Sequence, residues 1–152
     1  MTEQRIGVGG RWQVAEGIAP VLAGELRGPF GPVSAALTAS VDAPIVLSDP
    51  LERRTWTTAA GVAALWQPGQ VELGVDMGVE HQRWWQEAVL VKAAWRPQVG
   101  FRTGMCPMDG MVCLTGQAGW SLRRVSERTG GAAPTVATPL HVSAQAHLRR
   151  VR

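Results

Sequence analysis

An alternating pattern near the C-terminus constrains the fold more than any other feature of the sequence. Between residues 139 and 149, every second position is apolar and the positions between are polar. The apolar set is Leu140, Val142, Ala144, Ala146 and Leu148, and the polar set is His141, Ser143, Gln145, His147 and Arg149. Side chains two positions apart share a face only in an extended chain. The pattern therefore predicts a long β-strand with a buried apolar face and a polar face in water.

The same alternation recurs at residues 33–42, 70–77 and 120–123. Asp109-Gly110 lies between two apolar runs, which is a strong hairpin signal. Residues 78–97 fit either a strand or a helix, and we favour a strand because Trp and Val suit a pleated sheet. We predict an all-β fold, an antiparallel sandwich or jelly-roll-like barrel of about eight to ten short strands.

The length of 152 residues corresponds to one domain, and 18 Gly and 10 Pro spread along the chain fit many turns. The glycine-rich residues 1–10 predict an N-terminal arm, and residues 11–152 a single β domain with a basic last strand. The sequence has no apolar run of about 18 residues, and its start has no apolar stretch of a signal peptide. We therefore expect a virion or cytoplasmic location and no membrane span.

The net charge of +3 is unevenly distributed along the chain. Residues 121–152 contain six arginines and a single acidic residue, Glu127, so the first 120 residues are net negative. An acidic partner for the C-terminal end is expected, either carboxylates of a neighbouring protein subunit or the phosphates of nucleic acid. We favour the protein partner because the basic residues lack interleaved aromatic residues.

Five sulfur-containing residues lie within nine positions: Met105, Cys106, Met108, Met111 and Cys113. Such ligands would suit Cu(I), but sulfur side chains more often fill gaps in a core. The spacing lacks the Cys-x2-Cys pairs of a zinc ribbon. Two cysteines agree with a reducing compartment, although the pair flanks a turn and would form a cross-strand disulfide in an oxidising one. We expect no metal and no other cofactor.

Catalytic motifs are missing from the sequence. There is no Gly-x-Ser-x-Gly elbow and no phosphate-binding loop. His141 and His147 would lie roughly 20 Å apart along one strand, at about 3.3 Å per residue, so they cannot share a metal. Glu72 and Asp76 are interpreted as solvated residues on the polar face of a strand. The sequence therefore predicts no catalytic residues and a protein that is not an enzyme.

Two groups of residues are candidate interface sites. Trp84 and Trp85 are adjacent, so in a strand one ring would enter the core and the other would meet a partner. With the polar face of the last strand outward, His141, His147 and Arg149 would form a basic row that continues into Arg150 and Arg152. The expected partners are further copies of the chain, giving a homo-oligomer, or other structural subunits, with nucleic acid as second choice and no membrane.

These observations together predict a non-enzymatic structural or assembly protein. The absence of catalytic motifs and the seven tryptophans favour a virion component, such as a capsid, decoration or connector/tail subunit. The alternative is a ligand- or nucleic-acid-binding β-barrel that uses the basic C-terminus.

Overall fold

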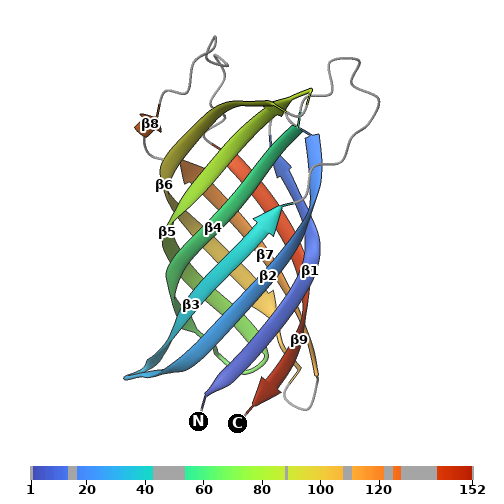
Figure 1. Cartoon of the computed structure of the whole chain (residues 1–152). Helices are drawn as coiled ribbons and strands as arrows, with labels where there is room; N and C mark the ends of the chain where they lie inside the picture. Colours follow the sequence, from blue (N-terminus) through green and yellow to red (C-terminus); the bar gives the residue numbers. More distant parts are fainter. Residues whose placement is uncertain are drawn as a thin grey trace.

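The computed structural model of the chain is a closed β-barrel (Figure 1). It describes residues 2–13, 17–42, 54–87, 89–107, 111–121, 125–127 and 140–151. The strands are β1 (Glu3–Gln13), β2 (Gly17–Phe30), β3 (Val33–Asp42), β4 (Arg54–Trp66), β5 (Val71–Gln86), β6 (Val89–Met105), β7 (Val112–Ser121), β8 (Val125–Glu127) and β9 (Leu140–Val151). The prediction of an all-β antiparallel fold with about eight to ten strands is confirmed, and the structure is the barrel rather than the sandwich, with barrel strands that are long rather than short.

Eight strands close the wall in the order β1-β2-β3-β4-β5-β6-β7-β9, with β9 pairing back onto β1 and every pairing antiparallel. The short β8 pairs with β6 near its start. Both termini lie at one end of the barrel, together with the β2–β3, β4–β5 and β6–β7 connections (Figure 1). We name this the turn end and the opposite end the loop end. Gly31 and Gly69 take positive φ values of 61° and 68° in two of these turns, where residues with a Cβ would be strained.

Two parts of the chain differ in detail from the sequence-based expectation. Residues 3–10, expected within an arm, belong to β1 and pair with β2 and β9 along their whole length. The segment 78–97 is strand rather than helix, as favoured, but it forms parts of two strands that reverse at Glu87. Among the described residues, no helix is long and apolar enough to cross a membrane.

Cys106 and Cys113 form a disulfide at the turn end, between the end of β6 and the start of β7. Both residues are completely buried. The sequence left open whether these two cysteines are reduced or bonded, and the structure has them bonded as a cross-strand disulfide. Two sulfurs bonded to each other are not available as thiolate ligands for copper.

The two faces of the strands are inverted relative to the prediction. On β9, the polar residues His141, Ser143 and His147 are buried inside the barrel, whereas Val142 and Leu148 are exposed on its outer surface. Glu72, predicted to be solvated, is fully buried. In a closed barrel of eight strands the interior accommodates one set of alternate side chains, and here that set is mostly polar, with a small apolar cluster of Ala36, Ala63 and Leu65. The apolar side chains consequently cover the outside.

Small residues in the wall make room for the large polar residues inside it. Gly7 lies opposite His147, and Gly119 lies opposite His141. A Cβ at Gly7 would overlap the imidazole of His147, and one at Gly119 would overlap that of His141. Each lumen histidine therefore packs directly over a neighbouring strand's glycine.

Cysteine labelling at two adjacent residues tests this inversion. Val142→Cys places a thiol on the outer surface, where Val142 is 42% exposed, and Ser143→Cys places one in the lumen, where Ser143 is 5% exposed. We expect a bulky apolar maleimide to label the first variant and to leave the second unreacted in the folded protein, as measured by mass spectrometry. Equal labelling rates at the two positions would contradict the inverted arrangement.

Candidate functional site: the polar lumen

Charged side chains fill the part of the lumen nearest the turn end, and Glu72 is at their centre. Its carboxylate accepts two hydrogen bonds of 2.6 Å from the guanidinium of Arg27, and one of 3.0 Å from Arg5. Arg102 adds a longer ion pair of 3.5 Å. Because β1, β2, β5 and β6 supply these groups, the cluster connects strands on different sides of the barrel.

Two more carboxylates complete this lower cluster. Glu25 pairs with Arg27 and with Arg102. Glu3 pairs with Arg5 and, at 3.0 Å, with Arg149 at the rim of the barrel. The lower cluster therefore consists of Glu3, Arg5, Glu25, Arg27, Glu72, Arg102 and Arg149. Buried charges of opposite sign require this mutual pairing, because an unpaired ion in the interior is costly.

A second cluster lies nearer the loop end. Arg11 of β1 donates a hydrogen bond of 3.0 Å to Asp42 of β3 and another to Glu80 of β5. Gln82 donates one of 2.9 Å to the same Glu80 carboxylate. His141 is buried beside this upper cluster. The upper cluster therefore links three strands across the lumen in the same manner as the lower one.

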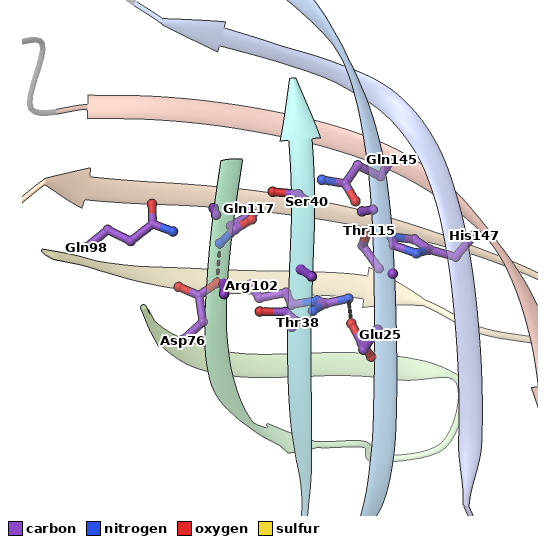
Figure 2. Close-up of a pocket in the computed structure, with 15 residues that line it drawn as sticks. Glu25, Thr38, Ser40, Asp76, Gln98, Arg102, Thr115, Gln117, Gln145 and His147 are labelled. Atoms are coloured by element: carbon purple, nitrogen blue, oxygen red, sulfur yellow. Dashed lines mark hydrogen bonds and ion pairs between the residues drawn. The ribbon is translucent and has the colours of Figure 1, made fainter. Parts of the chain in front are cut away.

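Between the two clusters lies a polar cavity of about 60 Å³ (Figure 2). Its lining includes Asp76 and Gln117, which are hydrogen-bonded to each other, and Thr115 and His147, whose side-chain atoms lie 2.9 Å apart. Arg102 reaches it from the lower cluster. Such a volume holds a few water molecules, since each needs roughly 10–15 Å³ by this type of measure. The cavity is too small for an organic substrate.

The chemistry of the lumen is that of structural ion pairing. The carboxylates of the two clusters are engaged by guanidinium groups, and Asp76 accepts a hydrogen bond from Gln117. No group of three or more His, Cys, Asp or Glu residues in the described parts of the chain is arranged to hold a metal ion. A second cavity beside Arg11 and His141 measures about 30 Å³. The two cavities are small and adjacent, and Ser40, Gln98 and Gln117 line both of them.

The outer surface of the barrel is apolar, in contrast to the lumen. Its exposed side chains include Ile6, Val8, Leu22, Leu26, Leu37, Val62, Val75, Met77, Phe101, Leu114 and Leu148. Exposed aromatic residues lie towards the two ends of the strands: Trp12, Trp56, Trp95 and Trp120 near the loop end, and Phe30 and Trp66 at the turn end. A contiguous apolar surface of this extent is rare on a soluble monomer.

The predicted interface residues do not form one site. Trp84 and Trp85 lie at the loop end of β5, where the register with β6 shifts between them. Arg149 is half-buried in the lower cluster and Arg150 is exposed on the outside at the turn end. Arg152 lies outside the described residues. Their use as an interface stays a prediction, but an outward basic row of His141, His147 and Arg149 is excluded because all three belong to the lumen.

Sequence reasoning missed the lumen residues that matter most. Arg5, Arg27 and Arg102 are separated by long stretches of sequence, and none of them was singled out as a candidate. A usable signal was present, because charged residues alternate with apolar ones in several strands, as in Glu25-Leu26-Arg27. A pairing between specific charges across a barrel cannot be read from that alternation alone.

Two solved structures share this fold. The crystal structure of Neisserial surface protein A has a TM-score of 0.68 and 10% sequence identity, covering 97% of this chain and 94% of that one. The crystal structure of a major outer membrane protein from Thermus thermophilus has a TM-score of 0.60 and 14% identity, covering 99% of this chain and 100% of that one. No protein-family model matches the sequence, and no curated protein matches it. At such identities the likeness shows the fold alone.

These findings overturn the functional prediction from sequence. The chain shares its fold with a surface protein and with a major outer membrane protein, and its own outer surface is apolar. The predictions of a virion component, of a virion or cytoplasmic location, and of structural-subunit partners without a membrane are therefore wrong. The alternative use of the C-terminal strand as a nucleic-acid surface also fails, because its His141, His147 and Arg149 side chains belong to the lumen.

Removing the central carboxylate of the lower cluster tests its structural role. Glu72→Gln deprives Arg5 and Arg27 of a charged partner, and we expect the free energy of unfolding to fall by about 3–5 kcal/mol, as for other broken buried pairs. Glu3→Gln is the matched control, with a smaller expected loss because that carboxylate lies at the partly exposed rim. Urea unfolding measures both. Equal stability of Glu72→Gln and the native sequence would contradict the role given to Glu72.

Proposed function

We propose that this chain is a membrane-spanning β-barrel of the outer-membrane type, with a lumen closed by ion pairs. The observation that carries the proposal is the inversion of the barrel, which is charged inside and apolar outside. In water this arrangement would expose the apolar surface and bury the charges, which is unfavourable on both counts. In a bilayer the same arrangement matches its surroundings.

The dimensions and hydrogen bonding of the wall support the proposal. The barrel strands contain 10 to 17 residues, whereas a tilted strand needs about 9–11 to cross the hydrocarbon core. Closure leaves each barrel strand paired on both sides, and lipid cannot satisfy free backbone groups. The exposed tryptophans near both ends fit the aromatic girdles of such barrels. The disulfide is compatible with an oxidising compartment such as the bacterial periplasm.

We further propose that the barrel has a structural rather than an enzymatic role. The carboxylates of the lower cluster are held by arginines, so they are poorly placed to act as bases or nucleophiles. The cavities of about 60 and 30 Å³ within the lumen are of water size, which also disfavours passage of solutes. A larger cavity of about 150 Å³ lies at the turn-end rim, beside Glu3, Arg27 and Arg149. Planar-bilayer recordings are expected to show no stable conductance from the native protein.

Depth-dependent fluorescence quenching tests whether the barrel spans a bilayer. We expect strong quenching of tryptophan emission when the refolded protein is inserted into vesicles of brominated phosphatidylcholine. Bromine near the headgroups should quench more than bromine near the chain ends, because the exposed tryptophans lie towards the ends of the strands. Tryptophan emission that is not quenched by bromine at any depth would contradict membrane insertion.

A pair of arginine substitutions on the outer face of β5 tests the same proposal energetically. Met77 lies midway along the wall and Val71 at its turn end, and both are exposed. We expect Met77→Arg to lower the unfolding free energy in vesicles by about 2–4 kcal/mol, and Val71→Arg by about 0–1 kcal/mol, following the cost of charge at different membrane depths. Similar effects at the two positions would argue against a bilayer around the barrel.

A further inference from the structure

The outer face of the barrel carries very little charge, and one of its charged residues lies in an aromatic setting. Among strand residues with described side chains, Arg83 on β5 and Arg150 on β9 are the arginines on this face. Arg83 lies near the loop end, on the side opposite to the buried Glu80 and Gln82. Arg150 lies at the turn end and has Gln4 as its register partner on β1.

Aromatic side chains lie near Arg83 on the outer face, although its partner on β6 is Ala93. The register places it directly opposite Trp56 on β4, which is 41% exposed on the outer surface. On its own strand, His81 is the preceding residue of the same face, and its ring stacks on Trp95 of β6 with centroids 4.3 Å apart. We name these four residues, Trp56, His81, Arg83 and Trp95, the Arg83 patch. The patch therefore combines a guanidinium with three aromatic rings on three neighbouring strands.

The guanidinium of Arg83 has a donor that the described residues leave unused. Its Nε is buried and has no hydrogen-bond partner among them. Arg5 also has a buried nitrogen without a partner, but Arg5 and Arg27 are paired with carboxylates, whereas no carboxylate among the described residues pairs with Arg83. A cation that faces a bilayer is costly unless it meets an anionic group, and the loop-end tryptophans indicate the depth of the lipid headgroups.

We propose that the Arg83 patch binds the phosphate of an anionic lipid headgroup at the loop-end surface of the membrane. This inference rests on the proposed membrane-spanning function. The guanidinium offers paired N–H donors that match phosphate oxygens, and its planar geometry is suited to two parallel bonds. The flanking tryptophans pack against the glycerol and upper acyl region, while the phosphate remains at the polar boundary.

The test uses the full-length barrel folded in non-ionic detergent micelles. Three probes are titrated: dioleoyl phosphatidic acid, dioleoylglycerol with the same chains but no phosphate, and inorganic phosphate. Binding is followed by native mass spectrometry and by the emission of the patch tryptophans. Native protein is expected to bind phosphatidic acid far more tightly than either other probe, and to lose affinity as salt concentration rises.

Variants locate the binding on Arg83. We expect Arg83→Gln to weaken phosphatidic acid binding roughly tenfold, equivalent to about 1.4 kcal/mol, since it removes charge-assisted hydrogen bonds to the phosphate. Arg83→Lys should retain part of the affinity because it keeps the charge and loses the paired donors. Arg150→Gln is the matched control and should bind like the native protein, because its register partner on β1 is Gln4 rather than an aromatic residue. Each variant must first be shown to fold. An unboiled sample should migrate on a gel in the same way as the unboiled native barrel.

The alternative outcomes separate this inference from the proposed function. Inorganic phosphate binding as tightly as phosphatidic acid would identify a free-phosphate site, and dioleoylglycerol binding equally well would show that the chains alone are recognised. Either result overturns the headgroup site. The site is also overturned if Arg83→Gln and Arg150→Gln lose the same amount of affinity for phosphatidic acid. Native protein that fails to insert into vesicles refutes the membrane-spanning function, whereas normal insertion without headgroup preference refutes only the lipid site.

Discussion

Closure of the backbone hydrogen-bond ladder is the constraint on which the rest of the structure depends. Once β9 pairs with β1, no barrel strand has a free edge, and every alternate side chain must point either into the lumen or away from it. Eight strands enclose an interior just wide enough for side chains to fill. The chain therefore cannot hydrate its inward residues freely, and their charges have to be neutralised by one another across the lumen.

That neutralisation explains why the lumen charges form clusters rather than isolated pairs. Glu72 alone contacts Arg5, Arg27 and Arg102, so its strand is connected to three others by charge-assisted hydrogen bonds and ion pairs. Replacing such a network with apolar residues would be tolerable energetically, but deleting one member leaves a buried charge unpaired. The clusters thus resist partial opening of the barrel, and the glycines opposite His141 and His147 supply the space that these large side chains need.

Much of the fold could be predicted from the sequence, whereas the side of each strand that is buried could not. Alternation on β9 correctly indicated a long strand and an all-β antiparallel barrel, because the period of two depends only on an extended backbone. It carries no information on which face is inside, since Val142 outward and Ser143 inward produce the same pattern as the reverse. The lumen site was missed for a related reason: Glu72 and Arg27 are brought together by closure of the barrel, which no local spacing encodes. Strands of ten or more residues with ionic groups on one face were the available clue.

The tryptophans show how one physical property can be given two different interpretations. A large apolar ring with a single N–H group suits a protein interface and the boundary between lipid and water equally well. Trp56 and Trp95 on the outer surface near the loop end meet the second requirement, and they do so beside Arg83. Depth along the barrel then sorts the outer residues: the middle of β5 exposes Val75 and Met77, whereas Arg83 and Arg150 lie towards the ends of their strands. Under the proposed membrane-spanning function, that sorting follows from the cost of charge in hydrocarbon, a constraint that an assembly surface facing another protein would not impose.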